Sequence, residues 1–153
     1  MTETLKNETV TVEKGEDSAR KRPCGTAASR REILADGSLR FTFPNLDRQC
    51  GDCSIFNAEI TISKGGPNAE FRMKATVNSS SSGDEWWLRF EFRNSQGGPV
   101  CYAPGPRPSI WWPLDIRYAD RPKNYEYTHF DSKIHGVPDD FTVAQDCYLF
   151  GEC

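Results

Sequence analysis

Apolar and polar side chains alternate with a period of two along much of the chain after residue 36. The clearest stretch is residues 85–93, Glu-Trp-Trp-Leu-Arg-Phe-Glu-Phe-Arg. A period of two predicts a β-strand with one buried face, because successive side chains point to opposite sides of a strand. The predicted buried face here carries Trp86, Leu88, Phe90 and Phe92. Aromatic residues are enriched in strands, so this stretch predicts a β-sheet with an aromatic core.

Three earlier runs show the same alternation. Their apolar positions are Leu39, Phe41 and Phe43, then Phe56, Ala58, Ile60 and Ile62, then Phe71, Met73, Ala75 and Val77. Loops rich in Gly, Pro, Asn and Ser separate the later runs. We therefore expect the strands at 56–62, 71–77 and 86–93 to form a three-stranded antiparallel meander.

The second half of the chain predicts shorter strands at 100–103, 110–118 and 125–129. Pro113 places the second of these at a sheet edge, because proline donates no backbone hydrogen bond. Residues 138–150 favour a short helix followed by a strand. The fold class is therefore all-β: an antiparallel meander that closes into a small calycin-like barrel or packs as a sandwich, with at most one short helix near the C-terminus.

Length and charge limit the remaining possibilities. A chain of 153 residues suits one domain, and we place it at 36–153 because residues 1–35 are highly charged and predict a flexible extension. Arg30 and Arg31 would lie in that solvated segment. The net charge of −3 argues against a nucleic-acid partner. No apolar run approaches the ~20 residues of a membrane span. Without an N-terminal signal pattern, we expect either a cytoplasmic protein or the mature form of a secreted one.

Six cysteines are many for this length. They predict disulfides in an oxidising compartment, and our preferred pairing joins Cys50 or Cys53 to Cys147 or Cys153. Free buried thiols in a cytoplasmic protein are the alternative. Cys50-Gly51-Asp52-Cys53 is also a C-x-x-C, but a thioredoxin-like pair needs a βαβ setting. A zinc site with Cys147 and Cys153 needs a second close pair, so we expect no metal.

Residues for catalysis are few. His129 and Asp131 could serve as an acid–base pair, with His135, Asp139 and Asp140 beyond them. Histidines and aspartates in a loop-rich stretch are more often surface residues. No serine-hydrolase elbow and no zinc-protease motif occurs in the sequence.

The aromatic residues are the more promising feature. In the doublets Trp86-Trp87 and Trp111-Trp112, one ring should face inward and its neighbour outward. The simplest interpretation is that the inward rings are core. The sharper hypothesis is an aromatic-walled pocket with hydroxyl, indole or imidazole groups that orient a ligand. Its candidate ligand-binding residues are Trp86, Phe90, Phe92, Trp111, Tyr125, Tyr127 and His129.

Three short segments resemble a small family of actinobacterial proteins of unknown function. They are Gly51-Asp52-Cys53, residues 81–86 (Ser-Ser-Gly-Asp-Glu-Trp) and the terminal Cys153. The resemblance covers roughly residues 50–153, and the Pro-rich stretch 104–108 departs from it. It implies a compact β domain and a bridge from Cys53 to the terminal region. It assigns no catalytic residue.

Two functions fit these features. The first is a β-barrel that binds an apolar small molecule in an aromatic pocket. It would act as a cyclase or isomerase by holding a natural-product-like substrate in its reactive conformation, without a cofactor. The second is a non-enzymatic secreted or surface module that binds a carbohydrate or a protein through exposed Trp87 and Trp112, with an inhibitor or immunity role in the same class.

Overall fold

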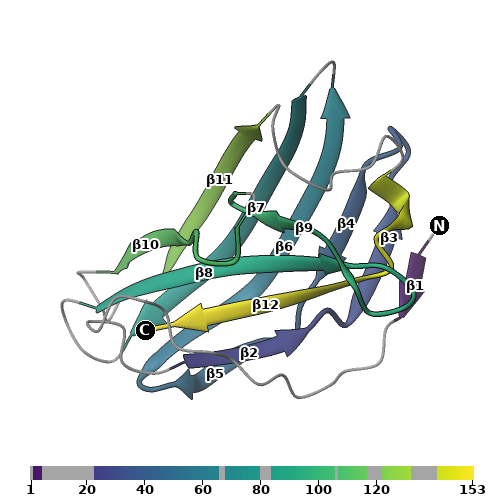
Figure 1. Ribbon diagram of the computed structural model, residues 1–153. Helices are drawn as coiled ribbons and strands as arrows, with labels where there is room; N and C mark the ends of the chain where they lie inside the picture. Colours follow the sequence, from purple (N-terminus) through teal and green to yellow (C-terminus); the bar gives the residue numbers. More distant parts are fainter. Residues whose placement is uncertain are drawn as a thin grey trace.

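The computed structural model describes residues 2–4, 23–65, 68–79, 84–105, 107–116, 122–131 and 141–153. These residues form two antiparallel β-sheets that pack face to face as a sandwich (Figure 1). The all-β prediction is confirmed. Of the two architectures that the pattern allowed, the sandwich is present, and the described strands do not close into a barrel.

The larger sheet has seven strands in the order β1-β3-β4-β6-β7-β11, and β5 pairs with β6 on the edge that β4 also occupies. The long β6–β7 hairpin forms its centre. Its strands are β1 (Thr2–Thr4), β3 (Arg30–Ile33), β4 (Leu39–Thr42), β5 (Leu46–Cys50), β6 (Cys53–Gly65), β7 (Asn68–Ser79) and β11 (Lys123–Asp131).

The smaller sheet has five strands in the order β10-β8-β12-β2. β9 and β10 share one edge of β8: β10 pairs with its first half and β9 with its second half. Pro113 lies in β10 at this edge, as the sequence predicts. The strands are β2 (Pro23–Ala27), β8 (Asp84–Arg93), β9 (Pro99–Ala103), β10 (Trp112–Ile116) and β12 (Asp146–Glu152).

The predicted three-stranded meander is wrong at its third strand. β6 and β7 form the expected hairpin, but β8 leaves the larger sheet and pairs with β9, β10 and β12 in the smaller one. Alternation shows which side chains of a strand face the core, and it is the same whichever sheet the strand joins. The aromatic strand therefore lies opposite the hairpin, at the centre of the second layer.

The domain begins earlier than residue 36. β2 pairs with β12 and β3 pairs with β4, so residues 23–33 contribute a strand to each sheet. Arg31, expected in solvent, is only 3% exposed: its Nε and Nη2 donate to the carbonyls of Ala144 and Thr142 at 2.9 and 2.7 Å. These carbonyls satisfy the buried guanidinium. Most of the remaining predicted extension, residues 5–22, lies outside the described part of the chain.

The C-terminal prediction is confirmed in outline. A 3-10 turn, η1 (Phe141–Val143), precedes β12, and residues 132–140 lie outside the described part. Among the described residues, no helix is long and apolar enough to span a membrane.

Aromatic rings from both sheets fill the space between them. Phe92 of β8 contacts Phe41 of β4 and Phe71 of β7, with ring centroids 5.7 and 5.6 Å apart. Phe90 contacts Phe43 at 5.4 Å. Such pairs contribute about 0.5–1.5 kcal/mol each beyond the area they bury. β8 is thus the strand that joins the two layers.

Tyrosines close one side of the sandwich. Tyr125 and Tyr127 of β11 face inward, and their hydroxyls donate to the carbonyls of Asp115 and Pro113 in β10, the latter at 3.1 Å. The two rings stack with centroids 6.0 Å apart. The edge of one sheet is thereby hydrogen-bonded to the edge of the other.

Gly151 in β12 marks a close approach to Trp86. A Cβ atom at this position would lie 3.0 Å from Cζ3 of Trp86 and 3.3 Å from Cδ2 of Leu88. Trp86 is fully buried and cannot move aside without disturbing the core. A glycine inside a strand is often explained by such crowding.

We predict that Gly151→Ala lowers the free energy of unfolding by about 1–3 kcal/mol, because the new methyl group overpacks the indole. Gly98→Ala is the matched control: its Cβ would meet only the Asn94 side chain, at 3.5 Å or more, and the cost should stay below about 0.5 kcal/mol. Denaturant unfolding checks both variants. Equal stability of the two variants would contradict this packing.

Candidate functional site

The aromatic residues predicted to line a pocket lie mainly in the core. Trp86, Phe90 and Phe92 are fully buried, and Phe90 and Phe92 contact other rings directly. Trp112, which the surface hypothesis expected to be exposed, is 6% exposed and packs edge-on against Phe90. The packing agrees with the simpler interpretation of these rings as core.

Trp111 is 8% exposed and Tyr125 and Tyr127 are half-buried, and these residues lie in two different places. The tyrosines are half-buried at the β10–β11 side, where burial raises the pKa of each hydroxyl. Trp111 lies over the opposite, outer face of the smaller sheet. There Arg89 packs between Trp111 and Phe150, with its guanidinium carbon 5.0 and 4.5 Å from the ring centroids. The seven predicted pocket residues therefore do not all come together.

His129 and Asp131 are in β11, where they pair with Phe71 and Ala69 of β7. Their side chains lie outside the described part of the structure, as do His135, Asp139 and Asp140. The acid–base hypothesis therefore stays a prediction.

The outer face of the larger sheet carries a different kind of site. Its strand pairing aligns polar residues in rows that cross the sheet. One row is Glu32, Arg40, Thr61, Arg72 and Thr128, and the next is Arg30, Thr42, Glu59, Lys74 and Glu126. Charges of both signs therefore lie side by side on five adjacent strands.

Two adjoining grooves run over these rows. The first has a volume of about 280 Å³ and is lined by Leu34, Asp36, Ser38, Arg40, Glu59, Thr61, Ser63, Glu70, Arg72 and Lys74. The second, of about 460 Å³, is lined by Asn57, Glu59, Lys74, Ala75, Thr76, Asn124, Tyr125 and Glu126. Glu59 and Lys74 line both grooves, so we call the combined feature the charged groove.

A bulge in β6 shapes the charged groove. The register between β6 and β7 shifts between Phe56 and Glu59, and Asn57 has a positive φ of 55°. Asparagine tolerates this conformation better than most residues. The Asn57 N–H is held by Oδ1 of Asn45 at 3.0 Å. A bulge bends the strand and increases its twist, so this face is not flat at the junction of the two grooves.

The ion pairs in the groove are exposed and therefore weak. Arg72 contacts Glu70 at 3.0 Å and Glu126 at 3.7 Å, and the Arg72 side chain is 48% exposed. Exposed pairs contribute about 0–1 kcal/mol, so a partner's charges can replace them at little cost. At the groove's end, the Ser38 N–H donates to Asp36 and lowers the pKa of its carboxyl below the usual value.

Three polar groups in the groove have unused bonding capacity. Lys74 and Glu59 lie opposite each other on β7 and β6, yet within the described part of the chain neither side chain makes a hydrogen bond or ion pair. Arg40 is paired with Glu32, but its buried Nε has no hydrogen-bond partner among the described residues. These groups are the strongest local indication that the face binds something polar.

Sequence reasoning missed the charged groove because it followed the apolar half of the alternation. The signal was present in the other half, in Glu70, Arg72 and Lys74 of one strand and Glu59 and Thr61 of the next. Which of these side chains become neighbours depends on strand register and on the bulge, and neither is visible in one sequence.

The C-x-x-C motif forms a two-residue hairpin turn. Cys50 pairs with Cys53, and Gly51 takes a positive φ of 68° that glycine adopts without strain. Both sulfurs reach the smaller sheet, where Cys50 bonds Cys24 of β2 and Cys53 bonds Cys153 after β12. The bridge from Cys53 to the terminus matches the prediction, and the motif crosslinks the two sheets.

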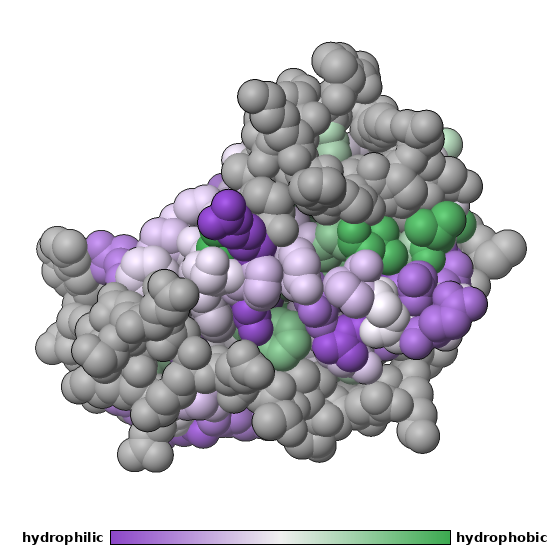
Figure 2. All heavy atoms as spheres, viewed as in Figure 1, coloured by the Kyte–Doolittle hydropathy of each residue, from purple (hydrophilic) through white to green (hydrophobic). Residues whose placement is uncertain are grey.

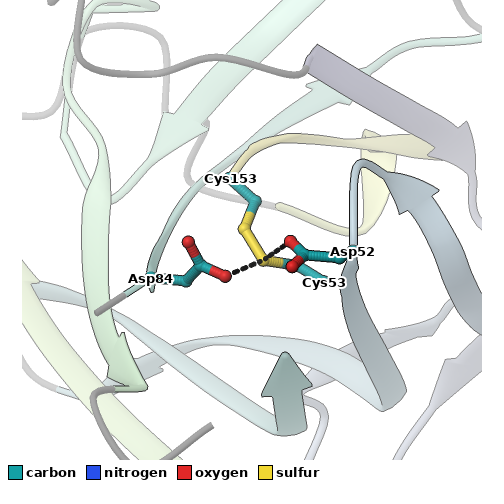
Figure 3. A group of neighbouring side chains, drawn as sticks. All are labelled: Asp52, Cys53, Asp84 and Cys153. Carbon is teal, nitrogen blue, oxygen red and sulfur yellow. Dashed lines mark hydrogen bonds between the residues drawn. A yellow bond between two sulfur atoms is a disulfide. The ribbon is translucent and has the colours of Figure 1, made fainter. Parts of the chain in front are cut away.

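Two carboxylates lie beside the second disulfide. Asp52 of the hairpin and Asp84 at the start of β8 point toward the bonded sulfurs of Cys53 and Cys153 (Figure 3). The Ser79 hydroxyl donates to Oδ2 of Asp84 and holds that carboxylate in place.

Cys147 is not in a disulfide: of the two C-terminal candidates, Cys153 forms the bridge and Cys147 stays a free thiol. Cys147 of β12 and Cys101 of β9 both pair with Phe92 of β8, from opposite sides, so the phenylalanine strand separates them. Burial raises the pKa of Cys101 to about 12, and that of Cys147 well above its usual value. Buried, protonated thiols of this kind behave as small apolar residues.

The outer face of the smaller sheet differs from the charged groove. Figure 2 views the molecule from the side on which β8 and β12 lie, and its green residues form small areas among purple and white ones. Arg93 covers Tyr148 with its guanidinium carbon 3.8 Å from the ring centroid and pairs with Glu91. The cations described on this face thus stack on its own rings.

Comparisons with known proteins give little further information. No family model matches the chain, and no curated protein matches it. Among solved structures, the fold is similar to that of a DUF1425 family member from Shewanella sp. pv-4, at 15% identity and a TM-score of 0.35. The similarity covers 79% of this chain and 93% of that one. A likeness this weak supports no functional argument.

We predict that stability falls as pH rises above about 9, partly because of Cys101. Between pH 9.0 and about 12 its thiol stays protonated in the folded protein, while the unfolded chain releases the proton. Rising pH therefore favours unfolding, by about 1.4 kcal/mol per pH unit for each such group. Cys101→Ala should make the pH dependence of unfolding measurably shallower.

The control for this experiment is Val100→Ala, which truncates the neighbouring side chain without removing a titrating group. Its unfolding free energy should change with pH as steeply as that of the wild type. A Cys101→Ala protein with the wild-type slope would show that the thiol ionises in the folded state.

Proposed function

We propose that this protein is a non-enzymatic binding module whose charged groove binds an extended polypeptide segment of a partner protein. The observation that carries the proposal is the Lys74–Glu59 position. Two opposite charges lie on adjacent strands where the two grooves meet, and within the described structure they pair with nothing. A partner that presents a negative charge to Lys74 and a positive charge to Glu59 would form an ion pair with each of them.

The spacing of the charged side chains along β7 favours a peptide. Side chains on one face of an extended chain recur every second residue, with a spacing of about 6.6–6.8 Å. A segment with acidic side chains two residues apart can therefore match Arg72 and Lys74, which lie two residues apart on one face of β7, while a basic side chain of the same segment pairs with Glu59 on the adjacent strand. Such complementarity mainly gives specificity and faster association.

A carbohydrate fits the first groove less well. Leu34 is the one apolar residue among its ten lining residues, and none of the ten is aromatic. Tyr125 is the one aromatic residue that lines the second groove, and its ring faces inward, where its hydroxyl donates to the carbonyl of Asp115. Neither groove therefore offers an aromatic face on which a sugar ring can stack.

The hypothesis of a templating cyclase or isomerase is less well supported by the packing. Phe90 and Phe92 already contact rings of the larger sheet, so an apolar substrate between the sheets would have to displace core side chains. The outer face needs no such rearrangement. The resemblance to an actinobacterial family of unknown function is compatible with a binding role and names no partner.

The test uses random peptides displayed on phage, selected on the wild-type protein and counter-selected on Lys74→Glu. We expect enriched peptides with charged residues at alternate positions. A synthetic consensus peptide should bind Lys74→Glu at least about tenfold more weakly, which corresponds to about 1.4 kcal/mol, in calorimetric titration. Binding to the wild type should also weaken with added salt.

Arg107→Glu is the matched control. It changes the net charge by the same amount at an exposed position in the loop before β10, away from the charged groove. Its affinity for the peptide should stay within about twofold of the wild type. Peptides that bind all three proteins equally, or enrichment of apolar aromatic peptides without charge, would contradict the proposal.

A further inference from the structure

Four side chains from three separate segments converge where the Cys50–Cys53 hairpin meets the C-terminus. They are Asp52, Cys53, Asp84 and Cys153, and one potential ligand atom from each lies within 4.8 Å of the others (Figure 3). Sγ of Cys53 is 3.9 Å from Oδ1 of Asp52 and 3.7 Å from Oδ2 of Asp84. Cys53 is fully buried, and the other three residues are half-buried.

The disulfide gives these carboxylates no favourable contact. A disulfide sulfur carries neither a proton nor a charge, so it donates no hydrogen bond to the oxygens beside it. Two carboxylates close together in a partly buried place repel each other and favour a cation between them. When Cys53 and Cys153 are reduced, the same place holds two thiols and two carboxylates.

We propose that the reduced protein binds one zinc ion through Cys53, Cys153, Asp52 and Asp84. Zinc takes thiolate and carboxylate ligands in a tetrahedral arrangement, with Zn–S of about 2.3 Å and Zn–O of about 2.0–2.2 Å. Such bond lengths place neighbouring ligand atoms roughly 3–4 Å apart. The two sulfur–oxygen distances already fall in this range.

Each step balances. A trialkylphosphine reduces the disulfide: the two sulfurs gain two electrons, phosphorus is oxidised to the phosphine oxide with oxygen from water, and the two water protons complete the thiols. Zinc then binds as each thiol releases its proton and donates a sulfur electron pair to the metal. The ion's positive charge also offsets the repulsion between the carboxylates.

The metal would replace the covalent crosslink with a coordinate one. The disulfide joins β6 of the larger sheet to the residue that follows β12 of the smaller sheet. The zinc ion would join the same two places and add Asp84 at the start of β8. The sheets would therefore stay connected at this corner in both oxidising and reducing conditions.

The experiment titrates the phosphine-reduced protein with Co²⁺ as a spectroscopic probe and then with Zn²⁺. We expect one Co²⁺ per chain, with a thiolate-to-cobalt charge-transfer band and the visible bands of tetrahedral cobalt, and displacement by one Zn²⁺. Cys153→Ser should weaken the charge-transfer band and the affinity strongly. Asp52→Asn and Asp84→Asn should each lower the zinc affinity at least about tenfold.

Two controls locate the metal. Asp47→Asn changes a carboxylate of the adjoining strand β5 that bonds Ser54 rather than the sulfurs, and its affinity should equal that of the wild type. Cys24→Ser/Cys50→Ser removes the other disulfide and should keep the cobalt spectrum. A full spectrum in Cys153→Ser would place the metal elsewhere and overturn the proposal, and so would wild-type affinity in both aspartate variants.

Folding of the reduced chain is followed by near-ultraviolet circular dichroism of its tryptophans. If reduction unfolds the protein, addition of one equivalent of Zn²⁺ should restore the folded spectrum, because metal binding is coupled to folding. Absence of both cobalt binding and zinc-induced refolding overturns the proposal.

Discussion

The contact between the two sheets at β8 is the interaction on which the rest of the structure depends. Phe90 and Phe92 reach across to Phe41, Phe43 and Phe71, so the larger sheet has its inner face covered by one aromatic strand and that strand's neighbours. Every other strand of the smaller sheet is placed by pairing with β8 or with β12 beside it. Removing this contact would leave both sheets with an exposed apolar face.

This packing also determines where binding can occur. The aromatic rings of the core pack against one another, so a ligand between the sheets would have to displace them. A sequence rich in aromatic residues therefore does not by itself produce an internal binding pocket. The outer face of the larger sheet has the opposite character, because its exposed ion pairs are weak and Lys74 and Glu59 have no partner within the described residues. Charged side chains that are free to pair with a partner, held on a rigid sheet, are a suitable basis for recognition.

The second constraint is the inter-sheet corner at the C-x-x-C hairpin. Gly51 allows the tight turn, the turn places Cys50 and Cys53 opposite each other, and each sulfur then reaches a different segment of the smaller sheet. The motif's spacing suggested redox or zinc chemistry with a second cysteine pair. The structure instead supplies Cys24, the terminal Cys153 and the two aspartates, which come from distant parts of the chain.

The sequence by itself determined most of the side chains that face inward, since the period of two in residues 39–43, 58–62, 71–77 and 86–92 depends only on the alternation of a strand. The prediction was wrong for Phe56, because the bulge in β6 shifts the alternation there and Ile55 is buried in its place. The sequence also determined the all-β class, the edge position of Pro113 and the hairpin of β6 and β7. Only the tertiary structure decided that β8 crosses to the second sheet, that Arg31 is buried, and that Cys147 is separated from Cys101 by Phe92. It also brought Glu59 and Lys74 together in one groove. Sheet membership and register depend on contacts between residues far apart in the chain, and a local pattern contains no information about them.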